Sequence, residues 1–524
     1  MAFTLLQAGS TLQLMDSSGT LTTLTLPTGV TLDSARRARM TVFQRYVIVV
    51  NSPTQPITVD PEGAVRVLCP QAPRTTLTLS GPTAGNLSGT FLSRQSFRIL
   101  DGDGNVIAES PLGPPTTAVT IAAKYLRVAA MDLSQEDITQ SRLYRTTTNG
   151  ATYLPWVDVD GNTQVTIEDD TPDALLTTLA EPILGQPPND LTLIAQYKER
   201  AWGVSATDVD TLRFTDVKRM FAWPATYGVV VGRPGSDSRG VTGLIARKEA
   251  LAAGRQDSIF QIVGESPTGF RAVKIKDGIG IESGDTVVIH RDVAYWLGKD
   301  GVYRWDDAGV TCISDGKVRS WFTTDTYFNR SRFQYAVATI DPVTHKYQLL
   351  LSAAGSSDLD RWVEFDITDQ TWWGPHKTSD FTPAWMGQIL DSNDLLIPVV
   401  ASTAGFIYKN QATRTDGTST AIDLDVDTKF HDFKTPTVEK TMGQLTLVSK
   451  IQAAGSLTIT PYLGGLDAPT GAPITASLTA GTETLRRLGG PAQFAKLNFR
   501  HNTAGQDVEL YGYELPWFEL SGRK

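Results

Sequence analysis

Three carboxylates lie among tryptophans between positions 362 and 373, and this combination could serve carbohydrate chemistry. A glycosidase needs a pair of carboxylates, one as acid and one as base or nucleophile, and Glu364, Asp366 and Asp369 could supply it. The flat apolar faces of nearby indole rings could stack on sugar rings. The tryptophans concerned are Trp362, Trp372, Trp373 and Trp385.

The same segment also has a structural interpretation. Residues 368–372, with the sequence TDQTW, resemble the Asp-box turn of sialidase-type propellers but lack its glycine. In this interpretation an Asp accepts hydrogen bonds from the turn backbone, and a Trp packs between neighbouring sheets. We favour it, and the sequence therefore predicts no catalytic residue and a protein that is not an enzyme.

Two Asp-rich segments, Asp101–Asn105 and Asp158–Asn162, begin like calcium-binding loops. A calcium-binding helix–loop–helix needs Gly at the sixth loop position and Glu at the twelfth. The first segment has Val106 and Leu112 there, and the second also lacks both residues. Strand patterns flank both segments, so we expect hairpin turns.

The histidines and cysteines are scattered along the sequence without metal-ligand spacing. The sequence also contains no Gly-x-Ser-x-Gly elbow and no phosphate-binding loop. We expect no metal, no cofactor and buried thiols in a protein made in a reducing compartment. The residues concerned are His290, His345, His376, His431, His501, Cys69 and Cys312.

The elements that must position these residues are clearest in the stretch 285–322. Four short apolar runs alternate there with turns rich in Asp and Gly, which indicates antiparallel hairpins. Four strands in so short a stretch match one blade of a β-propeller, about 40–50 residues long. Aromatic side chains of this stretch are large enough to fill the space between blades. The four runs are Thr286–Ile289, Val293–Leu297, Val302–Trp305 and Val310–Ile313.

Similar units recur on both sides of a segment with a different strand pattern. About seven short strands between residues 74 and 180, one of them Gly89–Ile99, suggest a fibronectin- or immunoglobulin-like sandwich. The predicted fold is all-β: a propeller-like ring of hairpin blades with this inserted sandwich and a C-terminal β-sandwich. The predicted parts are 1–70 (N-terminal strands and first blade), 71–184 (inserted sandwich), 185–415 (main propeller) and 416–524 (C-terminal sandwich).

Composition excludes several other classes of protein. The 524 residues are 41% hydrophobic and 20% charged, as in a globular core. A net charge of −9 argues against a basic nucleic-acid-binding surface. No apolar run is long enough for a membrane span, and the N-terminus lacks a secretory signal. We expect a soluble protein made in the cytoplasm.

Several short motifs resemble parts of bacteriophage virion proteins. LYRT at 143–146, NG at 149–150 and TIEDD at 166–170 look like the closing strands of fibronectin-like domains in such proteins. YKERAW at 197–202, IFQIV at 259–263 and KDGVYRW at 299–305, with Ile313-Ser314, resemble the tail nozzle family. This family, also called tail hub or tail tubular protein B, belongs to short-tailed, podovirus-type phages.

The resemblance implies a structural protein of the virion tail, assembled in the cytoplasm of the host bacterium. Such nozzles form rings, commonly hexameric, below the head–tail adaptor and portal, and they carry or adjoin tail fibres. Genome DNA passes through the lumen of the ring without sequence-specific binding. We expect a neutral to acidic lumen, because a cationic wall would hold phosphates and slow their transit.

Two alternatives remain open from the sequence. One is a carbohydrate-binding or glycosidase-type propeller, which would use the tryptophans named above. The other is a different virion part, such as a head fibre, collar or baseplate protein. In every case the long polar segments 233–240 and 353–360 are the candidates for projecting loops.

Overall fold

A computed structural model describes the chain except for residues 1–3, 17, 52–54, 101, 105, 135–137, 177–184, 236–238, 379, 392, 394, 411–414, 417–419, 465–468, 505, 507 and 520–524. Strands dominate, and the predicted all-β, propeller-like fold is confirmed. The chain divides into two compact units, residues 1–376 with 385–399 and residues 377–384 with 400–524. The four-part division made from the sequence stays a prediction.

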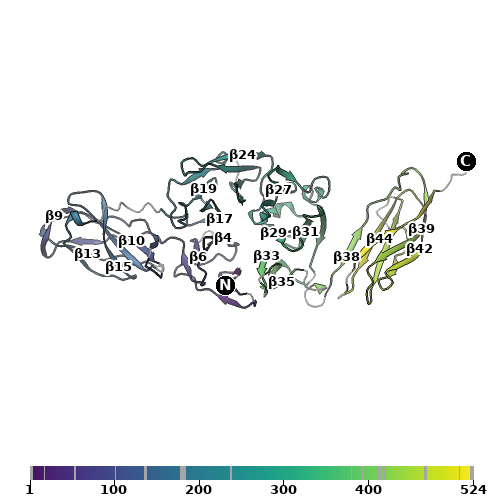
Figure 1. Cartoon of the computed structure of the whole chain (residues 1–524), viewed down its shortest axis with the longest axis horizontal. Helices are drawn as coiled ribbons and strands as arrows, with labels where there is room; N and C mark the ends of the chain where they lie inside the picture. Colours follow the sequence, from purple (N-terminus) through teal and green to yellow (C-terminus); the bar gives the residue numbers. More distant parts are fainter. Residues whose placement is uncertain are drawn as a thin grey trace. The chain divides into compact units, whose positions relative to one another are not determined.

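Seven small sheets, here called blades 1 to 7, follow one another around a ring in the described residues (Figure 1). Within each blade, every strand pairs with the next strand in sequence. The first three blades are β1 (Thr4–Ala8), β2 (Thr11–Met15) and β3 (Leu21–Thr23); β4 (Arg39–Phe43), β5 (Tyr46–Val50), β6 (Ile57–Val59) and β7 (Val65–Val67); and β17 (Leu191–Tyr197), β18 (Arg200–Ser205), β19 (Thr211–Phe214) and β20 (Gly228–Val230).

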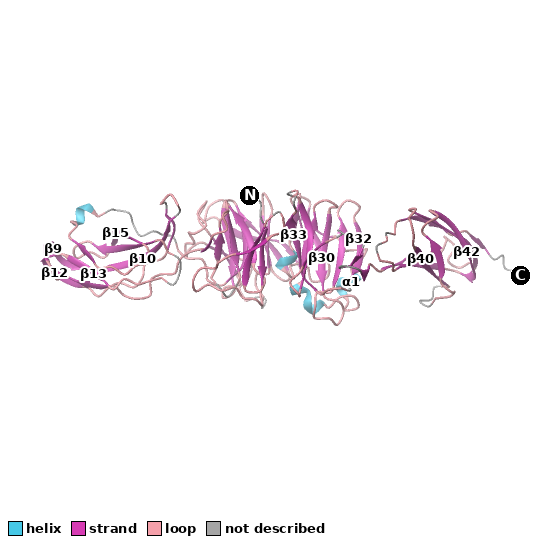
Figure 2. Cartoon of the chain, turned by 90° about the horizontal axis from the view of Figure 1, so that it is seen from below, coloured by secondary structure: helices cyan, strands magenta, loops and turns pink. Residues whose placement is uncertain are grey.

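Blades 4 to 6 repeat the four-stranded pattern, and blade 7 has three strands. Seen from the side, their strands run between two layers of loops (Figure 2). They are β21 (Gly243–Ala246), β22 (Leu251–Gly254), β23 (Ser258–Val263) and β24 (Arg271–Asp277); β25 (Val288–His290), β26 (Val293–Leu297), β27 (Val302–Asp306) and β28 (Gly309–Cys312); β29 (Val337–Asp341), β30 (Lys346–Leu351), β31 (Arg361–Asp366) and β32 (Thr371–His376); and β33 (Pro383–Leu390), β34 (Leu396–Ser402) and β35 (Ile407–Lys409).

Apolar clusters join each of the first five blades to the next. Burial of such clusters is the main stabilising term in folding, so the junctions hold the ring together. The clusters contain Leu12 and Val49 (blades 1 and 2), Phe43 and Leu191 (2 and 3), Trp202 and Phe260 (3 and 4), Ile245 and Trp296 (4 and 5), and Leu297 and Tyr347 (5 and 6).

The remaining two junctions close the ring through blade 7. On one side, the Gln388 side chain donates a hydrogen bond to the carbonyl of Ile340 in blade 6 (2.5 Å). On the other side, Met15 of blade 1 packs in an apolar cluster with Ile389 and Val399. The N-terminal strands therefore fill the gap between blades 7 and 2, and closure protects the sheet edges as in other propellers.

The stretch 285–322 forms the blade predicted for it, with β25 to β28 paired in order. Side chains alternate between the two faces of a strand, so its neighbouring aromatics reach different blades. Trp296 packs toward blade 4 and donates a hydrogen bond to the Gly280 carbonyl (3.0 Å). Its neighbour Tyr295 packs toward blade 6. The predicted role of these aromatics is confirmed.

Between blades 2 and 3 the chain forms three further sheets, in the orders β11-β10-β14-β15, β12-β9 and β16-β13-β8. The predicted single strand Gly89–Ile99 is wrong, because the chain leaves one sheet for another at Leu92 and makes two strands. The strands are β8 (Thr78–Ser80), β9 (Ala84–Phe91), β10 (Ser93–Leu100), β11 (Val106–Glu109), β12 (Val119–Lys124), β13 (Leu126–Ala129), β14 (Gln140–Thr146), β15 (Tyr153–Asp160) and β16 (Ile167–Asp169).

In its described residues the second unit contains two larger sheets, β38-β43-β40-β41 and β42-β39-β44 with β45 also paired to β39, and the two-stranded sheet β36-β37. An apolar core that includes Leu447 and Phe499 lies between the two larger sheets. The strands of this part are β36 (Thr415–Asp416), β37 (Thr420–Ala421), β38 (Leu424–Asp427), β39 (Lys440–Ser449), β40 (Ser456–Leu463), β41 (Ile474–Ser477), β42 (Thr482–Ala492), β43 (Ala495–His501), β44 (Leu510–Glu514) and β45 (Trp517–Glu519).

Helices are few and short. In the part of the chain that the structure describes, none is long and apolar enough to cross a membrane. They are η1 (Asp173–Leu175), η2 (Gly284–Thr286), α1 (Ser320–Thr323) and η3 (Arg330–Tyr335).

Ring closure predicts that blade 1 is essential to the propeller. Leu12 is fully buried in the cluster between blades 1 and 2, so Leu12→Ala should lower the free energy of unfolding by about 2–5 kcal/mol. Urea unfolding followed by tryptophan fluorescence measures this. Leu21→Ala in the same blade is the control, because Leu21 is 49% exposed and should change stability little. Equal effects of the two substitutions would contradict the assigned closure.

Candidate functional site at the axis of the propeller

Two residues of the proposed carbohydrate site serve the fold instead. The Asp366 carboxylate accepts hydrogen bonds from the backbone N–H groups of Thr368 (2.9 Å) and Asp369 (3.0 Å) and so caps the turn after β31. Trp372 donates from its indole to the Ile313 carbonyl (3.2 Å) and packs with Phe365 between blades 5 and 6. The structural interpretation is confirmed for Trp372, whereas the Asp that caps the turn is Asp366 and not Asp369 of the segment 368–372.

Glu364 lies on the same strand and is 6% exposed. Its two oxygens accept hydrogen bonds from Lys346 (3.3 Å) and Gln348 (2.9 Å), so this carboxylate too has a structural role. Burial lowers the pKa of the neighbouring His376, whose ring lies 5.5 Å from that of Trp362. Two further tryptophans of the proposed carbohydrate site differ in exposure. Trp385 is half-buried against blade 1, whereas Trp373 is 53% exposed.

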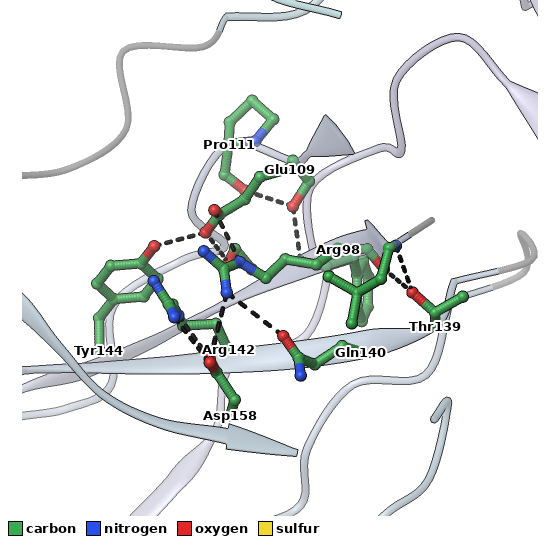
Figure 3. Close-up of polar contacts among 12 residues, drawn as sticks. Arg98, Glu109, Pro111, Thr139, Gln140, Arg142, Tyr144 and Asp158 are labelled. Atoms are coloured by element: carbon green, nitrogen blue, oxygen red, sulfur yellow. Dashed lines mark hydrogen bonds and ion pairs between the residues drawn. The ribbon is translucent and has the colours of Figure 1, made fainter. Parts of the chain in front are cut away.

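The second calcium-like segment supplies ion pairs within the inserted sheets (Figure 3). The Asp158 carboxylate accepts from the Arg142 guanidinium (2.5 and 2.7 Å) and lies 3.4 Å from Arg98. Burial alone would raise the pKa of Asp158, but the contacts to Arg142 outweigh it and lower the pKa. Asp101 and Asn105 of the first segment lie outside the described residues.

The same network continues to a buried carboxylate, Glu109 (Figure 3). It accepts from the hydroxyls of Ser96 (2.7 Å) and Tyr144 (2.5 Å) and from the Arg98 guanidinium (2.8 Å). Burial, followed by the charge of Glu109, raises the pKa of the Tyr144 hydroxyl. Such a network fixes the register of β10, β11 and β14, and its polar atoms are engaged with one another.

The tertiary structure brings together two histidines that the sequence separates. The rings of His290 and His345 lie 5.1 Å apart, and Arg291 approaches His345 to 3.1 Å. The separation of the histidines along the sequence did not indicate this pair. No group of three or more His, Cys, Asp or Glu that could hold a metal occurs among the described residues. Cys69 is buried and Cys312 half-buried.

The two polar segments predicted to project are described to different extents. Residues 236–238 of the first segment lie outside the described residues. The second segment is tied down: the N–H of Ala353 donates to Asp360 (2.7 Å), and Asn329 donates to the Ser356 carbonyl (2.8 Å). Its projection stays a prediction.

Two cavities of the described chain lie where the inner strands of blades 2 to 5 face the axis. They have volumes of about 530 and 220 Å³. Arg39 of β4 and Gly284 of η2 line both. The larger cavity is lined by residues of β4, β17 and β21 and by the start of blade 5, and the smaller one also by Arg239 and Glu282.

An ion-pair cluster joins opposite parts of this lining. The Asp285 carboxylate accepts from Arg39 (2.6 Å) and from Arg37 (3.3 Å). Arg39 also donates to the Thr192 carbonyl (2.7 Å), and Arg37 donates to the Tyr335 carbonyl (3.0 Å). Burial would raise the pKa of Asp285, but the charges of Arg39 and Arg37 outweigh it and lower the pKa. The basic segment 36–39 could be expected to form salt bridges, but nothing in the sequence indicated Asp285 as its partner, because this residue is about 250 positions away.

Comparison with known proteins gives no family for the chain. No family model matches it, and no curated protein matches it. Solved structures with which it aligns include an exo-β-1,3-galactanase from Phanerochaete chrysosporium (10% identity, 62% of this chain and 95% of that one, TM-score 0.23). Others are PorZ of the type-IX secretion system of Porphyromonas gingivalis (12%, 78% and 54%, 0.28) and Trypanosoma rangeli sialidase (7%, 98% and 95%, 0.26). TM-scores this low carry no argument about activity.

The lowered pKa of Asp285 predicts an acid-sensitive propeller. A carboxylate with a depressed pKa in the folded state stabilises it above the unfolded pKa of about 3.9, and this contribution is lost as the pH falls through the folded pKa. Asp285→Asn should lower the free energy of unfolding at pH 7 by about 2–3 kcal/mol and flatten its dependence on pH below about 4.

Urea unfolding between pH 3 and 7 measures both effects. Asp307→Asn is the control, because Asp307 pairs with Arg247 (2.7 Å) but its side chain is 98% exposed. This control should change stability little. An Asp285→Asn variant that keeps the full stability and acid sensitivity of the unmodified protein would contradict the role assigned to the cluster.

Proposed function

We propose that the chain is a structural virion protein, a tail nozzle or hub that forms a ring-shaped channel below the head–tail adaptor. The observation that carries the proposal is the order of parts: a closed ring of seven blades, interrupted after blade 2 by inserted sheets and followed by a separate β-sheet unit. This order agrees with the resemblance of the short motifs to the nozzle family. A packed ring of sheets makes a stiff wall for an assembly.

Two of the three carboxylates that could have served catalysis are engaged in fold contacts, which favours a structural role over an enzymatic one. Asp366 caps a turn, and Glu364 is bound by Lys346 and Gln348. At the propeller axis, Asp285 is held between two arginines. Genome DNA would therefore pass through the lumen enclosed by several copies and not through the bore of one propeller.

The proposal predicts a hexameric ring in the tail. Light scattering on purified protein should give six times the 56.9 kDa of one chain, or a monomer that assembles once the adaptor is present. Electron microscopy of virions should place its density on the tail axis below the portal, with a neutral to acidic lumen. Density confined to the head, a collar or a fibre would assign it to another virion part, and absence from virions would contradict the proposal.

One observation favours a second function, carbohydrate binding. Trp373 presents an exposed indole on the outer strand β32, and its N–H donates to the Thr371 hydroxyl (3.2 Å). An exposed tryptophan on a rigid strand is a platform on which a sugar ring can stack. The proposal of a nozzle does not require this platform.

A glycan array followed by titration tests the second function. Trp373→Ala should abolish binding of any saccharide found, because it removes the stacking surface without disturbing the core. Tyr327→Ala is the matched control, since Tyr327 is a 45% exposed aromatic between blades 5 and 6. Absence of saccharide binding, or equal losses in both variants, would contradict this candidate function.

A further inference from the structure

We propose that the axial cavity binds a small monocarboxylate with a compact apolar body. The carboxylate would lie beside Arg37 and Arg39, and the apolar body would lie along the inner strands in the larger cavity. This site belongs to a single propeller and is independent of ring assembly, so the two proposals can fail separately.

The first argument is the apolar lining of the cavity. Val42 of β4 is 64% exposed and Ile289 of β25 is 38% exposed, although both belong to strands inside the ring. Leu244 and Val287 line the same cavity and are only partly buried. Apolar side chains that face a cavity and not a packed core form the usual lining of a ligand site, and about 530 Å³ is within the range of such sites.

The second argument is the charge at the end of this cavity. Two guanidinium groups, those of Arg37 and Arg39, share the single carboxylate of Asp285. A guanidinium has five N–H donors. Contacts to Asp285 and Thr192 use two of the five donors of Arg39, which lines both cavities. Arginine is the side chain best suited to bind a carboxylate.

The carboxylates that already line the two cavities limit the ligand to one anionic group. In the smaller cavity, Arg239 is already paired with Glu282 (2.7 Å), so this second carboxylate would repel a further negative charge. Beyond it, the guanidinium of Arg332 lies over the Tyr335 ring at 3.9 Å, next to the carbonyl that binds Arg37. A single carboxylate can lie beside Arg39, whereas a second anionic group would meet Glu282 or Asp285, which line the two cavities.

The third argument is the position of the apolar and charged parts relative to each other. Arg39, Met40 and Val42 belong to one strand, β4, and residues 39, 40 and 42 all line the larger cavity. At the start of blade 5, the charged Asp285 and the apolar Ile289 likewise both line this cavity. A ligand about as long as the stretch from Arg39 to Val42 would therefore contact the charged part and the apolar part of the lining at once.

Titration calorimetry of the full chain with hexanoate, acetate and hexanamide tests the proposal. Hexanoate combines the charge and the apolar body, so it should bind in a saturable manner and at least about tenfold more tightly than acetate or hexanamide. Equal affinity for acetate would show an anion site without an apolar subsite, and equal affinity for hexanamide would show no role for the arginines. Either result, or the absence of saturable binding by hexanoate, would overturn the proposal.

Substitutions then locate the site. Val42→Gln should weaken hexanoate binding about tenfold and leave thermal unfolding unchanged, because Val42 is already exposed to the cavity. Val343→Gln is the matched control: Val343 is 71% exposed in the turn between β29 and β30, away from the cavity lining, and should bind hexanoate normally. Equal binding by the two variants would overturn the location.

Arg37→Gln tests the charged end separately. It should weaken hexanoate at least about tenfold, the usual size of a lost charge-assisted hydrogen bond, and leave the weak binding of hexanamide unchanged. Circular dichroism confirms that the variant is folded before the titration. A folded Arg37→Gln variant with normal affinity for hexanoate would overturn the assigned position of the carboxylate.

Discussion

Closure of the ring is the constraint on which the rest of the propeller depends. Each four-stranded blade is too small to bury its own two faces, so its stability comes from the blades on either side. The apolar clusters between blades 1 and 6 supply most of these contacts, and the cluster around Met15, Ile389 and Val399 joins the two ends of the sequence. Because the last contact connects strands almost 400 residues apart, the ring is complete only after the whole propeller has folded.

Several buried or half-buried carboxylates of the described residues also connect parts of the fold. Asp366 fixes a turn, Glu109 holds three strands of the inserted sheets in register, and Asp285 joins blades 2 and 5 near the axis. Each carboxylate is placed where burial would be unfavourable without a partner, and each has one. These three carboxylates serve the fold, and this is one reason why we propose a scaffold.

Much of the fold could be predicted because local sequence patterns indicate strands and turns. The blade at 285–322 was recognisable from alternating apolar residues and Asp-Gly turns, and its aromatics pack as expected. The prediction failed where a local pattern is ambiguous. Residues 89–99 look like one long strand, but the chain changes sheet at Leu92, and that change depends on the partners β12 and β14.

The sequence by itself determined the all-β class and the hairpin blades, since these depend on neighbours close along the chain. Only the tertiary structure decided the number of blades, the closure by the N-terminal strands, the His290–His345 pair and the Arg37–Asp285–Arg39 cluster. The physical reason is that these contacts join residues tens to hundreds of positions apart. Period-two patterns specify which face of a strand is buried, but not which distant strand covers it.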